Sequence, residues 1–262
     1  LKKRGKFSQR FFIRGIVNLW DMLVVGMKTL HWSASQFEDE EEELSDTALV
    51  ITLGVSFLFA IGLFIALPYG LTYLVGFTEE SSPVWFNIID GLIKIGIFVL
   101  YVYLIALMKD IFRVFQYHGA EHKAVHCFEQ KKELTARNAQ KFSRIHPRCG
   151  TSFVFLVMII AIFLFSFIPY LAQFIFPGIL HVHWGLRRAI YFILRISLLP
   201  IVAGFGYEVL RYSAKHLDNV FWKVIAKPGM WIQQLTTKEP TLKQLEVGIA
   251  ALKKVLVKEK IA

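Results

Sequence analysis

The chain consists of long apolar runs separated by polar stretches. About 20 consecutive apolar residues are needed to cross the hydrocarbon layer of a membrane as a helix. Four runs of that length cover roughly residues 47–77, 86–112, 151–176 and 189–212. Pro68 and Pro169 fall inside the first and third runs, where each predicts a kink or the end of the regular helix. The pattern predicts an all-α polytopic membrane protein with about four transmembrane helices.

Three further segments outside these runs have the spacing of amphipathic helices. Apolar residues recur every three or four positions through 12–28 and 217–227, with polar side chains on the opposite face. Both segments are expected to lie on the inner membrane surface, and Pro228-Gly229 is expected to end the second helix. In 242–256, apolar residues alternate at spacings of three and four, which predicts a C-terminal helix that docks on its own chain or on a neighbouring subunit.

The order of these segments predicts five regions. Residues 1–46 form a basic amphipathic N-terminal segment and an acidic linker, in which residues 38–43 are consecutive acids. The linker is expected to be solvated, and the alternative is a contact with a cation or a basic partner. The other regions are the first pair of transmembrane helices at 47–112, a cytoplasmic loop at 113–150, the second pair at 151–213, and an interfacial helix with a C-terminal helix at 214–262.

Composition agrees with a membrane location and gives the chain an orientation. Hydrophobic residues make up 55% of the sequence and charged residues 19%, with a mean hydropathy of +0.49, which does not suit a water-exposed surface. Residues 109–150 hold nine Lys or Arg and residues 211–262 hold ten, whereas the turn at 78–85 has none. Under the positive-inside rule, both termini and the central loop of this multi-pass chain are cytoplasmic.

The formal charge of +10 is therefore explained by the orientation of the chain and by contact with lipid headgroups. No nucleic-acid partner is expected. Two cysteines in 262 residues cannot staple a secreted domain of this size. The expected partners are membrane lipids and further copies of the chain in a homo-oligomer.

Half of the eight histidines and both cysteines fall between residues 109 and 150. His118 and His122 lie one turn apart if the second span continues as a helix, so their ring nitrogens can converge on one ion. Glu121 completes the pattern H-x-x-E-H, in which two histidines hold zinc and the glutamate polarises the attacking water. The loop therefore predicts a site for zinc or another divalent metal, with Glu121 as general base. His126 is a spare candidate ligand, and Cys127 is expected to be a half-buried thiol.

A second motif, His146-Pro147-Arg148-Cys149-Gly150, places a histidine and a cysteine three residues apart in a turn. A set of His118, His122, His146 and Cys149 would be a closed, structural zinc site, whereas a set that lacks one of these ligands stays open for catalysis. The alternative is that the histidines bond headgroups or main-chain carbonyls at a helix end.

Charged residues lie inside the predicted spans, among them Asp90, Lys94, Arg195 and Glu208. Each costs about 2.5–3.5 kcal/mol at the centre of a helix unless it is paired or hydrated. Asp90 is expected to pair with Lys94, one turn further along the helix, and with Arg195 across the bundle. Glu208 falls near the inner surface. It is expected either to supply a carboxylate as the third ligand of the H-x-x-E-H metal, or to pair with Arg211 or extend toward the inner surface.

Three ordered motifs, at 115–123, 146–153 and 228–240, carry a resemblance to a known family. Together they resemble the YqhQ-like family of bacterial membrane proteins, and the similarity extends over nearly the whole chain. The resemblance implies a location in the bacterial inner membrane and a protein class of unknown function, with metal dependence as an expectation. Carried over onto this sequence, it marks His118, Glu121, His122, His146, Arg148, Cys149 and the turn at 236–240.

Three functions are consistent with the sequence. The first is a zinc-dependent hydrolase that acts on a lipid-linked or peptide substrate at the inner leaflet. The second is an oligomeric structural, lipid-handling or transport protein whose loop is stapled by a metal or by polar contacts, and the charges inside the spans favour it. The third is a scaffold whose C-terminal helix recruits a cytoplasmic partner.

Overall fold

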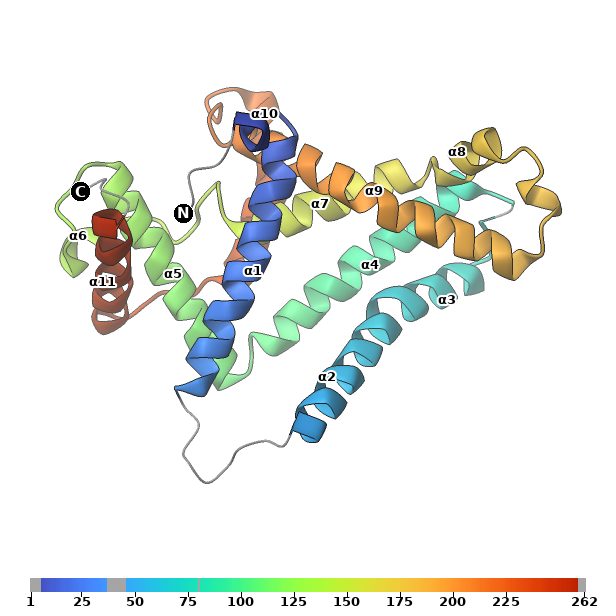
Figure 1. Cartoon of the computed structure of the whole chain (residues 1–262). Coiled ribbons are helices and arrows are strands. Elements are labelled where there is room, and N and C mark those ends of the chain that lie inside the picture. The colour runs from blue at the N-terminus through green and yellow to red at the C-terminus, as the bar shows by residue number, and fades with distance from the viewer. Residues whose placement is uncertain (1–5, 37–45, 80, 259–262) are drawn as a thin grey trace. The chain divides into compact units, whose positions relative to one another are not determined.

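The computed structural model of the chain describes residues 6–36, 46–79 and 81–258, and in these ranges it contains helices and no strand (Figure 1). The predicted all-α fold class is confirmed. The acidic run at 38–43 lies outside the described residues.

The described residues divide into two compact units. Unit 1 contains 98–157 together with the described residues from 209 onward. Unit 2 contains the described residues up to 97 together with 158–208. Each unit has its own packed interior.

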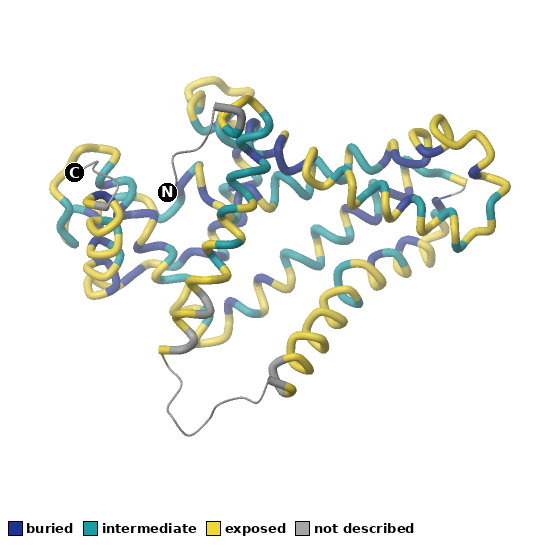
Figure 2. The backbone as a smooth tube through the Cα atoms, viewed as in Figure 1, coloured by how far each residue is buried: buried dark blue, intermediate teal, exposed yellow. Residues whose placement is uncertain are grey.

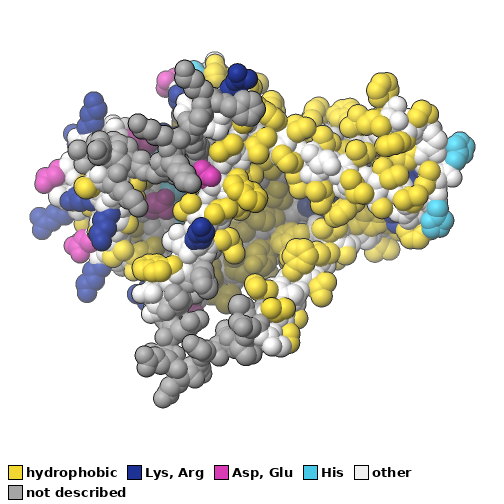
Figure 3. Space-filling view, in the orientation of Figure 1, with side chains coloured by type: hydrophobic (Ala, Val, Ile, Leu, Met, Phe, Trp, Pro, Cys, Tyr) yellow, Lys and Arg dark blue, Asp and Glu magenta, His cyan; other side chains and the backbone are white. Residues whose placement is uncertain are grey.

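Three helical stretches are long and apolar enough to cross a membrane. They are Val50–Leu74, α4 (Pro83–Ile105) and α9 (Trp184–Ser213). A fourth span results if α7 (Gly150–Phe165) and α8 (Ile168–Ile175), which are bent by 46°, are counted as one. Hydrophobic side chains dominate the surface over much of the chain (Figure 3). The predicted number of about four spans agrees with these helices.

Both predicted proline interruptions are present as changes of backbone geometry. α2 (Asp46–Ile61) passes through a π-helical turn, η2 (Gly62–Ala66), into α3 (Leu67–Leu74), in whose first turn Pro68 is buried. Proline has no N–H and its ring clashes with the carbonyl four residues earlier, so the helix widens just before Pro68. Pro169 occupies the equivalent position in the first turn of α8, directly after the bend.

The prediction that Pro228-Gly229 ends a helix is wrong. α10 (Val220–Thr236) begins after Asn219, whose side chain caps the N–H of Phe221 (2.9 Å), and it runs through Pro228. A proline inside a helix costs about 3 kcal/mol, which is why the sequence predicted an end here. A Cβ on Gly229 would lie 2.8 Å from the Cβ of Ser152, so only glycine lets α10 approach the start of α7 this closely.

The histidine-bearing helix is separate from the second span. α4 ends at Ile105, a turn follows at 106–108, and α5 (Lys109–Glu129) begins after Met108, whose backbone is extended. The predicted extension of the span to residue 112 is therefore wrong. Asp110 lies in the first turn of α5, where a negative charge is favoured by the helix dipole, and this polar start marks a new helix.

The interior of unit 1 lies between α5, the short helix α6 (Ala136–Gln140) and α11 (Leu242–Lys258). Leu245 and Ile249, from the predicted C-terminal seam, are buried there among small side chains. These are Ala120, Ala124, Cys127 and Ala139. The apolar face of the C-terminal helix is thus buried within unit 1, which confirms that this helix docks on its own chain.

In unit 2, α1 (Ile13–Ser35), which follows the short helix η1 (Lys6–Gln9), packs against α9 where both helices have a glycine. A Cβ on Gly15 would lie 3.0 Å from main-chain atoms of Gly204. Beside this contact Arg14 forms an ion pair with Glu208, which also accepts the N–H of Phe12 (3.2 Å). The predicted N-terminal helix is confirmed as a helix, and its position on a membrane surface stays a prediction.

Three of the charged residues of α4 and α9 that the sequence analysis singled out, Asp90, Lys94 and Arg195, are paired inside unit 2. Lys94 forms the predicted ion pair with Asp90. Arg195 instead donates to Oε1 of Glu79 (2.6 Å) and to Oδ1 of Asn87 (3.0 Å), so the predicted Asp90–Arg195 pair is wrong. The reason is that Glu79, in the turn between the first two spans, is buried beside α9 and supplies the counter-charge.

Another part of the interior of unit 2 lies where α8, η3 (Ile179–His181) and α9 meet. Its buried members are Ile168, Ala172, Ile179 and Tyr191. By contrast, α2 is exposed over its described side chains (Figure 2). Burial in unit 2 is therefore concentrated at helix contacts, and the described apolar side chains of α2 are exposed.

Replacing Leu245 by Ala should destabilise unit 1, because Leu245 is fully buried between α11 and α5. Loss of a buried leucine side chain costs about 2–5 kcal/mol of unfolding free energy. Thermal unfolding of the full chain in detergent would measure this as a lowered melting temperature. Val247→Ala is the matched control, since Val247 on the same helix is 53% exposed, and equal effects of the two substitutions would contradict the packing described.

Candidate functional site

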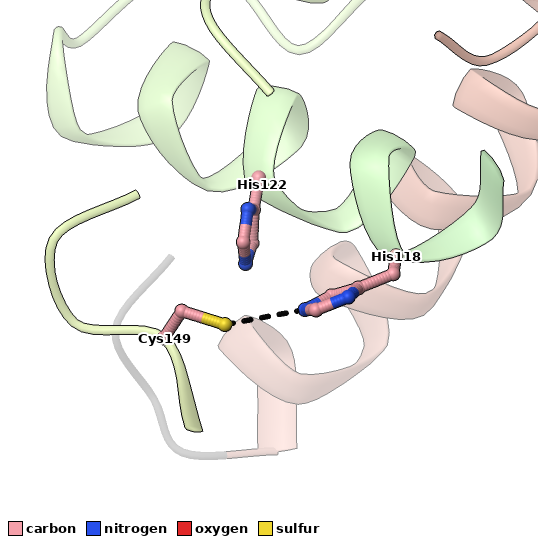
Figure 4. A group of neighbouring side chains, drawn as sticks. All are labelled: His118, His122 and Cys149. Atoms are coloured by element: carbon pink, nitrogen blue, oxygen red, sulfur yellow. Dashed lines mark hydrogen bonds between the residues drawn. The ribbon is translucent and has the colours of Figure 1, made fainter. Parts of the chain in front are cut away.

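The histidines of α5 recur at four-residue intervals on one face and meet the segment that leads into α7. Figure 4 shows His118 and His122 projecting from α5 toward Cys149. Nε2 of His118 lies 3.3 Å from Sγ of Cys149, and the ligand atoms of all three residues lie within 4.8 Å of one another. His122 and Cys149 are buried and His118 is half-buried. The structure brings three of the predicted ligands together, and they are called the His–Cys group below.

Main-chain carbonyls fix the rings of both histidines. Nδ1 of His118 lies 2.8 Å from the carbonyl oxygen of Thr236, and Nδ1 of His122 lies 2.6 Å from that of Arg144. A carbonyl oxygen can only accept, so each Nδ1 carries a hydrogen and Nε2 is the atom left to meet the thiol or a metal. Metal-binding histidines commonly donate their other ring N–H in this way. The two imidazoles therefore have the orientation and the tautomer that metal binding requires.

The same contacts determine the charge of the group. Burial by itself would raise the pKa of the Cys149 thiol, but hydrogen bonds from His118, His122 and Thr151 outweigh burial and lower that pKa to about 5. For His118, burial would lower the imidazole pKa, but the hydrogen bond to Cys149 and the charge of Cys149 lead the interactions that raise it overall. The contact therefore favours a thiolate at Cys149 that is hydrogen-bonded to the His118 imidazole.

A second group next to the first contains the fourth predicted ligand, His146. His126, Glu129 and His146 offer ligand atoms within 4.8 Å of one another. Nδ1 of His146, however, accepts the N–H of Arg148 (3.2 Å), so its Nε2 carries the hydrogen and donates it to Glu129 (3.4 Å). Burial, and then the charge of His126, lower the pKa of His146 to about 4, which keeps this ring neutral. The predicted set of four ligands is thus divided, and both ring nitrogens of His146 are already used.

Gln233 holds the segment that carries Cys149. Its side chain is fully buried, and its amide pairs with both main-chain groups of His146: Oε1 accepts the N–H and Nε2 donates to the carbonyl oxygen, each at 2.8 Å. Nε2 also donates to Oγ of Ser152 (2.5 Å) in the first turn of α7. Sequence reasoning did not single out Gln233 as a site residue. The sequence signal that could have identified it is an amide on the apolar side of an amphipathic helix. Such a side chain is expected to be buried and to need hydrogen-bond partners.

The segment after α10 closes over α5. A Cβ on Gly119 would overlap the carbonyl oxygen of Lys238, so glycine is required at this position for the segment to lie against the helix. Buried Lys123 anchors the segment by pairing with Glu239 (2.6 Å). The carbonyl that orients His118 belongs to Thr236, the last residue of α10, directly before this segment, so these contacts help to position it.

The remaining predicted site residues lie outside the His–Cys group. Glu121 is exposed on α5, and its charge contributes to raising the pKa of His118. Glu208 belongs to unit 2, where its ion-pair partner is Arg14, whereas the sequence suggested Arg211. Cys127 is fully buried rather than half-buried, and its Sγ donates to the carbonyl oxygen of Glu133 (3.4 Å).

Replacing Gly119 by Ala should displace the segment at Lys238, because the added methyl group overlaps a main-chain carbonyl that cannot rotate away. Overpacking of this kind costs about 1–3 kcal/mol, so the melting temperature should fall. Gly96→Ala is the matched control, because nothing lies within 4 Å of the added Cβ and alanine is favoured over glycine in a helix by up to about 1 kcal/mol. Unchanged melting temperatures for both variants would contradict the close approach.

After metal removal with a chelator, alkylation of Cys149 by iodoacetamide should show a midpoint near pH 5, because its thiol pKa is lowered to about 5. Cys127 is an internal control. Burial raises its pKa, so its peptide should stay unmodified over the same range in a mass-spectrometric measurement. His118→Ala should move the Cys149 midpoint upward toward that of an ordinary thiol, and an unmoved midpoint would show that His118 does not stabilise the thiolate.

The chain can now be compared with known proteins. A family described as "Protein of unknown function (DUF1385)" matches residues 11–258, which include both groups of the site. The chain is 33% identical over 261 residues to "Uncharacterized protein YqhQ" of Bacillus subtilis (strain 168), a similarity that covers 94% of this chain and 76% of that protein. No solved structure matches the chain. As the resemblance of its motifs predicted, the chain belongs to the DUF1385 family.

Proposed function

We propose that this chain is an integral membrane protein whose His–Cys group binds a divalent transition metal, with zinc as the best candidate. One observation carries the proposal. Both imidazoles donate Nδ1–H to main-chain carbonyls, which leaves the Nε2 atoms of His118 and His122 beside Cys149. The lowered thiol pKa of about 5 supplies the thiolate that metal binding needs.

The spacing and the chemistry of the donors fit zinc. Zn–N bonds of about 2.0–2.1 Å and Zn–S bonds of about 2.3 Å, at tetrahedral angles, separate nitrogen from sulfur by roughly 3.5 Å. The corresponding separation between His118 Nε2 and Cys149 Sγ is 3.3 Å. Thiolate and imidazole ligands favour zinc and similar metals, whereas magnesium and calcium prefer oxygen ligands. An ion would therefore need only small movements of these side chains.

Three protein ligands leave one tetrahedral position open, as in catalytic rather than structural zinc sites. A zinc ion in the group would supply Lewis acidity for hydrolysis. The function that this arrangement supports best is a metal-dependent hydrolase. Glu121 is the candidate general base, because it lies on the same helix and its charge acts on His118. With the site at the inner membrane surface, as the distribution of Lys and Arg predicts, lipid-linked or peptide substrates would be within reach.

An oligomeric structural or transport protein is the second candidate. The charges inside the spans favoured it from the sequence, but Asp90, Lys94 and Arg195 have partners within unit 2 and so do not require a polar pore. The observation that still favours it is α2, whose described apolar side chains are exposed and available to lipid or to another copy of the chain.

Metal analysis of the full chain, purified in detergent and reconstituted with zinc, tests the proposal. We expect about one zinc ion per chain, the stoichiometry of a single three-ligand site. His118→Ala and Cys149→Ser should each remove most of the metal, whereas His126→Ala, in the second group, should retain it. Glu121→Gln should also retain the metal and should abolish hydrolysis of lipid-linked or peptide substrates.

The outcomes separate the parts of the proposal. A wild-type protein that takes up no zinc, or a Cys149→Ser variant with wild-type zinc content, would exclude the His–Cys group as a metal site. Loss of zinc from Glu121→Gln would instead make Glu121 a ligand and remove it as the base. Recovery of the protein from the soluble fraction without detergent would exclude the membrane location.

A further inference from the structure

A pocket of about 510 Å³ lies between α3 and the start of α9 in unit 2. Its lining consists of Tyr69, Gly70, Tyr73, Trp184 and Arg188. Three aromatic rings thus surround one cation at the ends of two helices that are apolar enough to span a membrane. The proposed metal site makes no use of this pocket.

Two of the rings hold the Arg188 side chain. Its guanidinium carbon lies 5.1 Å from the ring centroid of Tyr69 and 5.0 Å from that of Trp184. Contacts with aromatic faces restrain the guanidinium group and leave N–H groups for an acceptor that can bind two of them at once. Within the described part of the chain, no acceptor forms a hydrogen bond with this side chain.

The described carboxylates of this part of unit 2, Glu79 and Asp90, already have partners. Glu79 accepts a hydrogen bond from Arg195 at 2.6 Å, and Asp90 pairs with Lys94. Arg188 acts on Glu79 only through space: burial raises the pKa of the Glu79 carboxyl, and the charges of Arg195 and Arg188 oppose that rise. Among the described residues, these pairs leave Arg188 as the cation of the pocket without an ion-pair partner.

We propose that this pocket binds the phosphate of an anionic phospholipid headgroup. Arginine binds phosphate through two parallel N–H···O bonds, and Tyr and Trp are enriched where helices leave the hydrocarbon layer. Leu74 and Leu186, which are neighbours of lining residues in the sequence, are exposed and offer apolar surface to acyl chains. In the predicted orientation the headgroup would belong to the outer leaflet. This inference rests on the proposed membrane location and is independent of the metal.

A free phosphate ion has the same chemistry at the guanidinium group, so the source must be distinguished by experiment. The aromatic lining and the apolar surface beside it favour a lipid, because a soluble ion would use neither.

Native mass spectrometry of the delipidated full chain in detergent tests the inference. Titration with dioleoylphosphatidylglycerol should show one tightly retained lipid, and dioleoylphosphatidylcholine, whose headgroup has no net charge, should bind more weakly. Arg188→Gln should weaken phosphatidylglycerol binding about tenfold, as expected for loss of a charge-assisted hydrogen-bonded contact. Arg187→Gln, which removes the same charge from the adjacent residue, should leave it unchanged. Arg188→Lys, which keeps the charge but not the planar fork, should give an intermediate affinity.

Several results would overturn the inference. Equal affinities for the two lipids would show that the pocket does not select an anionic headgroup. Equal losses in Arg187→Gln and Arg188→Gln would show a general charge effect without a site. If inorganic phosphate at millimolar concentration displaces the lipid, and also binds when no lipid is present, the ligand is a soluble anion. If Arg188→Gln lowers the melting temperature, the Arg188→Lys variant becomes the test. An unchanged preference of this variant for phosphatidylglycerol over phosphatidylcholine would exclude binding of the phosphate by the two N–H groups of the guanidinium. Loss of lipid selectivity in a protein that still partitions into membranes would leave the membrane location intact.

Discussion

The hydrogen bonds from His118 and His122 to main-chain carbonyls make the chemistry of the site depend on the packing of unit 1. The two carbonyls are distant in sequence from the rings that they orient, by 118 and 22 residues respectively. Neither bond can form in an isolated α5. The rings are aligned only when α5, the segment before α7 and the end of α10 lie together. Contacts that look remote from the chemistry, such as the close approach at Gly119 and the amide of Gln233, therefore act on the site through the carbonyls that they position.

Both units bury polar groups and satisfy most of them, but they do so in different ways. In unit 1 the partners are mainly backbone groups, as for Gln233 and for Lys123, which donates to the carbonyl oxygen of Gln140 (3.0 Å) as well as pairing with Glu239. In unit 2 charges on neighbouring helices and the turn at Glu79 pair with one another. A buried polar group without a partner costs about 1–3 kcal/mol, so such contacts select one packing arrangement among many. The apolar surfaces of the long apolar helices are not selective in this way, since one apolar contact can replace another.

Periodicity and residue type in the sequence predicted the helices, the number of spans and the docking of α11, because apolar spacing reports which face of a helix is buried. Spacing alone also placed His118 and His122 on one face, and the second motif brought in Cys149. The division of the histidines into two groups was not predictable, since it depends on the backbone N–H of Arg148 occupying Nδ1 of His146. The pairing of Arg195 with Glu79 and the passage of α10 through Pro228 depend on contacts across the fold, which a local pattern does not contain.

The late position of Thr236 in the sequence has a consequence for biosynthesis. When α5 leaves the ribosome, the carbonyl that will orient His118 has not been synthesised, and α7, α8 and α9 are made before it. The nascent chain therefore carries a His118 side chain that lacks its carbonyl partner while Cys149 and the apolar helices after it are being made. Domains generally fold as units. The orientation of His118, and with it one of the hydrogen bonds that lower the thiol pKa of Cys149, is thus acquired only after α10 has been made.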